Sequence, residues 1–163
     1  MKAIINNEVE IEVKETITGF CNSDIVSIII PDGVITIGDN AFDGCESLKE
    51  ITIPDGVTKI GNAAFLYCSS LEKITIPDSV MGIGDNAFDG CSSLKEINIP
   101  DSVTTIGNGA FEWCTSLKEI NIPDNVTEIG DYAFYNCSSL EDIYIPNSVT
   151  KIGDYAFDCD FLE

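Results

Sequence analysis

Apolar and polar positions recur along most of this chain with a period of 23 residues. Every proline keeps this step, as do six of the phenylalanines and six of the glycines. Self-similarity at a fixed period is the signature of stacked repeats, because each unit must bury its apolar face against the next. We therefore expect a solenoid of about six 23-residue units. The residues that keep the step are Pro31, Pro54, Pro77, Pro100, Pro123 and Pro146; Phe42, Phe65, Phe88, Phe111, Phe134 and Phe157; and Gly38, Gly61, Gly84, Gly107, Gly130 and Gly153.

Each unit contains two segments with the pattern of short strands. In the unit 91–113, Ile97 and Ile99 alternate with polar residues, as in a half-buried strand. Pro100 ends this strand, since proline has no N–H to donate to a ladder. Residues 103–106 then return along a second side as another short extended segment.

The rest of the unit has the pattern of a short helical turn. Gly107 interrupts the strand, Asn108 follows at an N-cap position, and Ala110, Phe111 and Cys114 face inward. The sequence thus predicts a leucine-rich-repeat solenoid, a β-rich member of the α/β class. Its curved stack has a parallel β-sheet on one face and short strands and helical turns on the other. The predicted N-caps are Asp39, Asn62, Asp85, Asn108, Asp131 and Asp154.

The two ends depart from the repeat. Residues 9–13 alternate apolar and acidic side chains, and the Asn6-Asn7 pair can close a hairpin between them and residues 3–5. We predict that residues 1–22 form an N-terminal capping segment and that residues 23–163 form the solenoid, with a truncated last unit. The C-terminal edge has no polar cap in the sequence, so it is either open or continued in a longer protein.

The recurring motif is A-F-x-x-C-x-S-L-x-x-I-x-I-P-x-x-V-x-x-I-G, over about residues 23–163. It closely resembles the BspA-like (treponemal-type) leucine-rich repeats. Members of that family are typically surface or secreted proteins of host-associated bacteria and some protozoan parasites. The resemblance implies adhesion or binding of a host extracellular or surface protein, and a secreted or cell-surface location. The first residues lack a long apolar stretch typical of a secretory signal, so a cytoplasmic location is the alternative.

Charge and composition narrow the function. The chain has 28 acidic residues against 8 lysines, no arginine and no histidine, for a formal charge of −20. Nucleic acid is therefore not expected as a partner, because phosphate binding needs clustered cations. No segment approaches the length of a membrane span. The lack of histidine removes the commonest general base and metal ligand, and no catalytic motif is present. We predict a non-catalytic protein without cofactor or resident metal.

Outward positions of the first strand in each unit form the candidate binding surface. They vary from unit to unit, while the inward positions are always apolar. The alternative is a solvated surface with cross-strand Lys/Glu pairs. Only Ile29 and Tyr144 are typical of binding hot spots. The candidate residues are Ile29, Glu50, Thr52, Lys73, Thr75, Glu96, Asn98, Glu119, Asn121, Asp142 and Tyr144.

Aromatic residues gather on the other side of the last units. Tyr132 and Tyr155 occupy equivalent positions in successive units and should stack. Together with Trp113 and Tyr135 they form a candidate contact patch, with Tyr67 further back. The alternative is amphipathic cover over the helical turns.

Two other rows suggest chemistry. Five of the seven cysteines keep the 23-residue step, and we predict buried free thiols, with Cys21 and Cys159 the most exposed. An aspartate follows five of the six prolines, and these carboxylates either share Ca²⁺ or each cap their own turn; we favour the caps. The aspartates are Asp32, Asp55, Asp78, Asp101 and Asp124.

The sequence leaves three hypotheses for function. The first is a protein-interaction module. The second is a structural spacer that self-associates through the C-terminal edge, and the third is a module that binds in a Ca²⁺-dependent way.

Overall fold

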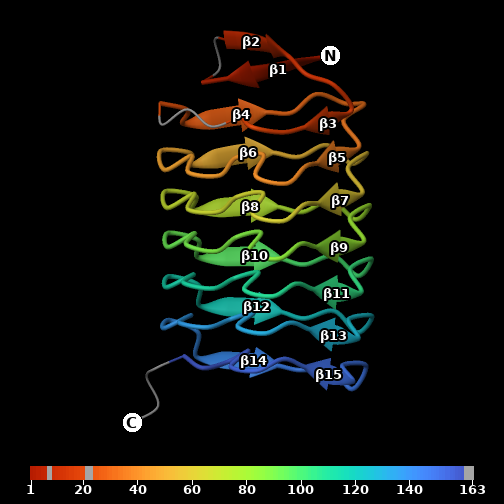
Figure 1. The fold of residues 1–163 in the computed structure, drawn as a ribbon, viewed down its shortest axis with the longest axis vertical. Helices are drawn as coiled ribbons and strands as arrows, with labels where there is room; N and C mark the ends of the chain where they lie inside the picture. The colour runs from red at the N-terminus through yellow and green to blue at the C-terminus, as the bar shows by residue number, and fades with distance from the viewer. Residues whose placement is uncertain (7–8, 21–23, 160–163) are drawn as a thin grey trace.

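The computed structural model describes residues 1–6, 9–20 and 24–159. The chain winds into a β-solenoid of about six coils, and each coil gives one strand to each of two sheets (Figure 1). No helix occurs in the described residues, so none there is long and apolar enough to cross a membrane. The predicted leucine-rich-repeat solenoid with its parallel sheet is confirmed.

The first sheet has eight strands in the order β14-β12-β10-β8-β6-β4-β1-β2. These are β1 (Lys2–Ile5), β2 (Val9–Glu12), β4 (Ser27–Ile29), β6 (Glu50–Thr52), β8 (Lys73–Thr75), β10 (Glu96–Asn98), β12 (Glu119–Asn121) and β14 (Asp142–Tyr144). The second sheet has seven strands in the order β15-β13-β11-β9-β7-β5-β3. These are β3 (Thr16–Ile17), β5 (Thr36–Ile37), β7 (Lys59–Ile60), β9 (Gly82–Ile83), β11 (Thr105–Ile106), β13 (Glu128–Ile129) and β15 (Lys151–Ile152).

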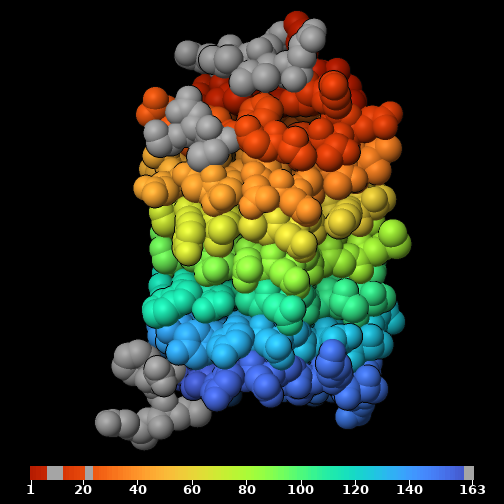
Figure 2. All heavy atoms as spheres, viewed as in Figure 1, coloured from red at the N-terminus to blue at the C-terminus, as the bar shows by residue number. Residues whose placement is uncertain are grey.

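Strand pairing between coils follows the 23-residue step of the sequence. Ile97 of β10 lies in parallel register between Ile74 of β8 and Ile120 of β12. The same holds in the second sheet, where Ile106 lies between Ile83 and Ile129. Equivalent residues are therefore direct neighbours, and each inward column of the repeat becomes a ladder of like side chains. Figure 2 shows the coils as contiguous bands of colour along the long axis.

The N-terminal end is built differently from the coils. Strands β1 and β2 form an antiparallel hairpin, and β1 also pairs antiparallel with β4, where Ile5 lies opposite Ile28. Strand β3 pairs parallel with β5 and begins the second sheet. Asn6 has a positive φ of 51°, and its Oδ1 accepts the Val26 N–H at 2.7 Å; Asn7 lies outside the described residues. The division into a capping segment at residues 1–22 and a solenoid at 23–163 stays a prediction.

The third side of each coil consists of hydrogen-bonded turns, and we call it the turn side. The helical turns predicted from the sequence do not form there. In one coil, the N–H of Cys91 donates to the carbonyl of Phe88 at 3.1 Å, as in a tight turn, while the N–H of Phe88 itself donates to Ala110 in the next coil at 2.8 Å. Two residues there have positive φ, Asn86 (53°) and Gly90 (72°), which interrupts any helix. The turn side comprises residues 38–48, 61–71, 84–94, 107–117, 130–140 and 153–159.

A ladder of phenylalanine rings fills the core beneath the turn side. From Phe42 to Phe157, neighbouring ring centroids lie 5.2–5.3 Å apart and the rings are stacked. The five rings from Phe42 to Phe134 are fully buried, and Phe157 in the last coil is half-buried. Phe20 packs edge-on against Phe42 at 6.0 Å and closes the ladder at the N-terminal end.

A second ladder consists of cysteines. The prediction that the in-register cysteines are buried is confirmed for Cys45, Cys68, Cys91, Cys114 and Cys137. From Cys68 to Cys137, each thiol donates to a phenylalanine carbonyl of the preceding coil at 3.1–3.3 Å. Cys159 is half-buried, and its thiol still donates to the Phe134 carbonyl at 3.2 Å, although it comes one residue early in the sequence. Burial raises the pKa of the Cys91, Cys114 and Cys137 thiols, so these three remain protonated. Cys21 lies outside the described residues.

The stacked phenylalanines make a quantitative prediction about stability. Phe88→Ala should lower the free energy of unfolding by about 3–5 kcal/mol, because it leaves a cavity between two buried rings. Phe157→Ala is the matched control, and its loss should be clearly smaller since this ring is half-buried. Urea unfolding followed by circular dichroism measures both. Equal losses in the two variants would contradict a ladder in which the central rings are more deeply buried than the last one.

Candidate functional site

The outward side of the first sheet holds the eleven residues predicted from the sequence, and we call it the strand face. In β6, β8, β10 and β12 the middle residue is buried and the two flanking residues are exposed. This alternation follows from the pleat of a strand. Because the strands are in register, the outward residues form two rows across the sheet. The charged row is Glu50, Lys73, Glu96, Glu119 and Asp142, and the neutral row is Ile29, Thr52, Thr75, Asn98, Asn121 and Tyr144.

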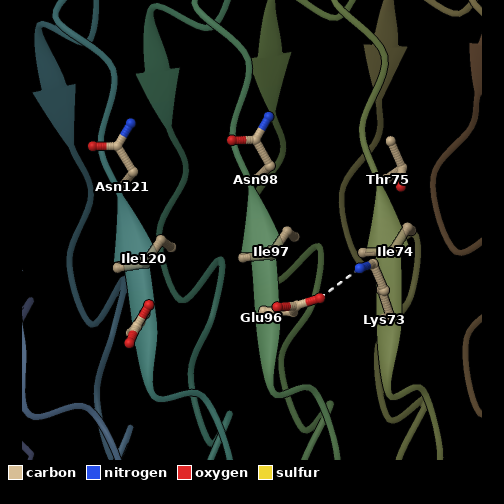
Figure 3. Close-up of a pocket in the computed structure, with 9 residues that line it drawn as sticks. Lys73, Ile74, Thr75, Glu96, Ile97, Asn98, Ile120 and Asn121 are labelled. Carbon is tan, nitrogen blue, oxygen red and sulfur yellow. Dashed lines mark hydrogen bonds and ion pairs between the residues drawn. The ribbon is translucent and has the colours of Figure 1, made fainter.

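A shallow groove runs between the two rows at the centre of the strand face (Figure 3). It crosses β8, β10 and β12, with the outward residues of these strands as its walls. Ile74, Ile97 and Ile120 also line it, but their side chains point into the core, so the strand backbone forms the floor. A neighbouring groove continues over β6 and β8. The surface thus offers a narrow floor of strand backbone between charged groups on one side and hydroxyl and amide groups on the other.

Ion pairs link neighbouring coils along the strand face. The Lys73 ammonium lies 2.5 Å from Glu96, and beside it the Lys95 ammonium lies 2.7 Å from Glu72. Hydrogen bonds from these lysines lower the pKa of Glu96 and of Glu72. All four side chains are largely exposed, so solvent screens these pairs and they add little to stability. The cross-strand Lys/Glu pairs expected of a solvated surface are therefore present within the candidate site.

The two predicted hot-spot residues do not come together. Tyr144 is 65% exposed on β14, whereas Ile29 is 42% exposed on β4. They occupy opposite ends of the neutral row, with β6, β8, β10 and β12 between them. A single ligand of modest size therefore contacts the central groove or one end of the strand face, but not both end residues.

On the turn side, four aromatic residues form one connected group, which we call the aromatic cluster. Tyr132 stacks on Tyr155 at 5.3 Å, which confirms the predicted stack. Tyr135 packs edge-on against Tyr132 at 5.6 Å and against Trp113 at 6.2 Å, and so joins the three others. Tyr67 lies apart from them, with its ring over Gly90 of the next coil.

The row of alternating aspartate and asparagine has a different role from the one expected. From Asp39 to Asp131, each side chain accepts a backbone N–H from the next coil. Asp85 Oδ1 accepts the N–H of Asn108, and Asn108 Oδ1 accepts that of Asp131, both at 2.8 Å. The interpretation as N-caps of helical turns within the same coil is therefore wrong, because the turn side has no helix to cap. A Cβ on Gly107 would lie 2.6–2.8 Å from the preceding coil, so this close approach requires the glycine.

The aspartates that follow the prolines are all exposed. The turn at each of these positions is closed by the backbone, as where the Val103 N–H donates to the Pro100 carbonyl at 3.0 Å. Within the described residues, no group of three or more histidine, cysteine, aspartate or glutamate side chains is placed to hold a metal ion.

The turn side also contains a pair of carboxylates, Asp89 and Glu112, that was not predicted from the sequence. Oδ1 of Asp89 is buried without a hydrogen-bond partner among the described residues. Burial, and secondarily the charge of Glu112, raises the pKa of Asp89 to about 6. The pKa of Glu112 is also raised by burial, against a hydrogen bond from the Trp113 side chain. The two residues occupy equivalent positions in successive coils, so the 23-residue step was the signal that could have found them.

Comparison with known proteins places these features in a family. The family model described as "BspA type Leucine rich repeat region (6 copies)" matches residues 16–107 and 81–163. A comparison with curated protein sequences finds no match.

Several solved structures are similar to the chain. A leucine-rich cell surface protein from Faecalibacterium prausnitzii A2-165 is 36% identical with a TM-score of 0.79, over 99% of this chain and 44% of that one. A leucine-rich repeat protein from Bacteroides ovatus ATCC 8483 is 34% identical with a TM-score of 0.67, over 94% of this chain and 46% of that one. The leucine-rich repeat protein of T. pallidum is 30% identical with a TM-score of 0.69, over 78% and 73% of the two chains. The chain thus spans less than half the length of the first two proteins.

The inter-coil role of the aspartate and asparagine row is open to direct test. Asn108→Ala should lower the free energy of unfolding by about 1 kcal/mol at any salt concentration, because the Asp131 N–H loses its acceptor. Asn108→Asp keeps the acceptor but sets a third carboxylate between Asp85 and Asp131, so its loss should disappear in about 1 M NaCl. Urea unfolding at two salt concentrations distinguishes them. A salt-independent loss in both variants would speak against this role.

The raised pKa of Asp89 predicts a pH dependence. Between about pH 4 and pH 6 the folded chain binds more protons at this residue than the unfolded chain, so stability falls as the pH rises through that window. Asp89→Asn should therefore raise the free energy of unfolding at pH 7, by up to about 1 kcal/mol after solvent screening, with no gain at pH 4. Asp43→Asn, at the equivalent position two coils earlier, is the matched control. A gain of the same size and pH dependence in both variants would contradict the burial of the Asp89 carboxylate as its cause.

Proposed function

Because the chain belongs to the BspA-type leucine-rich-repeat family, we propose that it is a non-catalytic protein-interaction module that binds its partner through the strand face. The observation that carries the proposal is the central groove across β8, β10 and β12. Its walls present hydrogen-bonding groups at the regular spacing of parallel strands. Polar side chains in such rows can supply the direct hydrogen bonds that protein–protein interfaces contain.

The contrast between inward and outward residues supports this proposal. The middle residue of every first-sheet strand from β4 to β14 is isoleucine, because stacking demands it. The outward residues on the same strands include threonine, asparagine, tyrosine, lysine and glutamate. Stacking places few limits on these positions, so their identities are available for recognition of a partner.

We further propose that the partner is an extracellular or surface protein of a host, and that the chain acts in adhesion at the cell surface. The proposal is supported by one similar structure, which is that of a leucine-rich cell surface protein. Because this chain spans less than half of that protein, its location and partner come to this chain by analogy only.

Binding by the strand face is tested with two triple variants. Thr75→Ala/Asn98→Ala/Asn121→Ala removes the neutral wall of the groove. The matched control, Thr104→Ala/Thr127→Ala/Thr150→Ala, removes three exposed threonine hydroxyls beside the second sheet. Against immobilised matrix and serum proteins in surface plasmon resonance, the first variant should bind a captured partner at least about ten-fold more weakly, a change of about 1.4 kcal/mol. The control should bind like the unmodified chain.

Two outcomes would overturn the proposal: no matrix or serum protein binds, or the partner binds both variants equally. Analytical ultracentrifugation over a concentration series separates the alternative of a self-associating spacer. A monomer at all concentrations removes that alternative, whereas oligomers that persist in the strand-face variant favour it.

A further inference from the structure

The turn side differs in charge from the two sheets. The six segments that make up the turn side include nine carboxylates and no lysine. All eight lysines lie on the strands of the two sheets or within two residues of them. The turn side therefore presents negative charge without compensating cations, and it attracts positively charged groups. The carboxylates are Asp39, Asp43, Glu46, Asp85, Asp89, Glu112, Asp131, Asp154 and Asp158.

Three members of the aromatic cluster have a backbone conformation that is unfavourable for bulky side chains. Tyr132, Tyr155 and Trp113 have φ values of 58°, 56° and 58°, in the left-handed region. Bulky residues seldom occur there, whereas glycine and asparagine adopt it readily. Other coils of the same chain use those residues at equivalent positions: Asn40, Asn86 and Gly109 in the column of the two tyrosines, and Gly44, Gly90 and Asn136 in the column of the tryptophan.

Burial does not offset this strain. Trp113, Tyr132 and Tyr155 are 49%, 41% and 60% exposed, so their rings add little to the core. Asparagine or glycine would satisfy the backbone better, and three other coils use them in each column, with Ala63 and Tyr67 as the exceptions. The rings therefore serve the surface rather than the fold. Exposed aromatic residues of this kind are enriched at binding sites.

We propose that the aromatic cluster binds a cationic, arginine-bearing segment of a protein partner. The face of an aromatic ring attracts a guanidinium group, which also stacks on it. Asp131 and Asp154 directly precede the two stacked tyrosines, and both are exposed, so a carboxylate accompanies each ring. The site lies on the turn side and is independent of the strand face.

Trp113 gives the site a built-in reporter, since it is the only tryptophan of the chain. Its indole packs edge-on against Tyr135, with ring centroids 6.2 Å apart. Fluorescence of Trp113 therefore responds to a ligand at the cluster and not to one on the strand face.

The experiment titrates the whole chain with a short peptide that contains four arginines, at 0.15 M salt. The control ligand is the same peptide with citrulline, which is neutral and nearly the same shape. We expect saturable quenching of Trp113 by the arginine peptide only. Tyr132→Asn/Tyr155→Asn should weaken binding about four- to twenty-five-fold, from about two- to five-fold for each ring, and should not lower the melting temperature.

Two further variants test whether binding depends on the aromatic rings or only on the negative charge of the turn side. Tyr132→Phe/Tyr155→Phe keeps the ring faces and should bind like the unmodified chain. Tyr67→Gly removes an exposed aromatic residue that lies outside the cluster, also at a positive φ of 56°, and should leave binding unchanged. Equal binding of the citrulline peptide, or undiminished arginine binding by the double asparagine variant, would overturn the proposal. Either result is independent of any binding by the strand face.

Discussion

Backbone hydrogen bonds between successive coils are the interaction on which the rest of the structure depends. They act on all three sides of the solenoid. Beside the first sheet they run in both directions, since the Lys49 N–H donates back to the Val26 carbonyl at 2.8 Å and the Ile30 N–H donates forward to the Thr52 carbonyl at 3.2 Å. On the turn side, Phe88 donates forward to Ala110 at 2.8 Å. A coil held in this way cannot shift against its neighbours without losing bonds on every side. Its residues must therefore stack on their equivalents, and the ladders of phenylalanine, cysteine and isoleucine follow.

This constraint also explains which parts of the fold could be predicted from the sequence alone. A fixed period with apolar residues at fixed positions determines both sheets and the buried columns, so the strands, the phenylalanines and the in-register cysteines were predictable. The turn side was not, because its conformation depends on positive φ angles rather than on apolar spacing. One column of these positions holds asparagine, alanine, glycine and tyrosine in different coils. A column of glycines alone would have indicated positive φ, but this mixture does not, and a helical turn was expected instead.

The candidate sites show the same division. Outward residues of the strand face were identifiable from alternation alone, since a strand has only two sides. Their grouping into a central groove, with Ile29 and Tyr144 far apart, depends on the order of the strands. In the aromatic cluster, the link between Trp113 and Tyr132 runs through Tyr135, which belongs to a different column of the repeat. Periodicity gives the columns but not the contacts between them.

The separation of bonded partners in successive coils stays between 22 and 26 residues, and this has a consequence for how the chain folds. Each new coil closes a loop of the same length, whichever coil has formed first, so the entropy lost per coil is constant along the stack. Folding can therefore start at any adjacent pair of coils and spread in both directions as a zipper. Adding coils in such a chain lengthens the zipper without requiring contacts between residues more distant in sequence, and the initiation step keeps its rate.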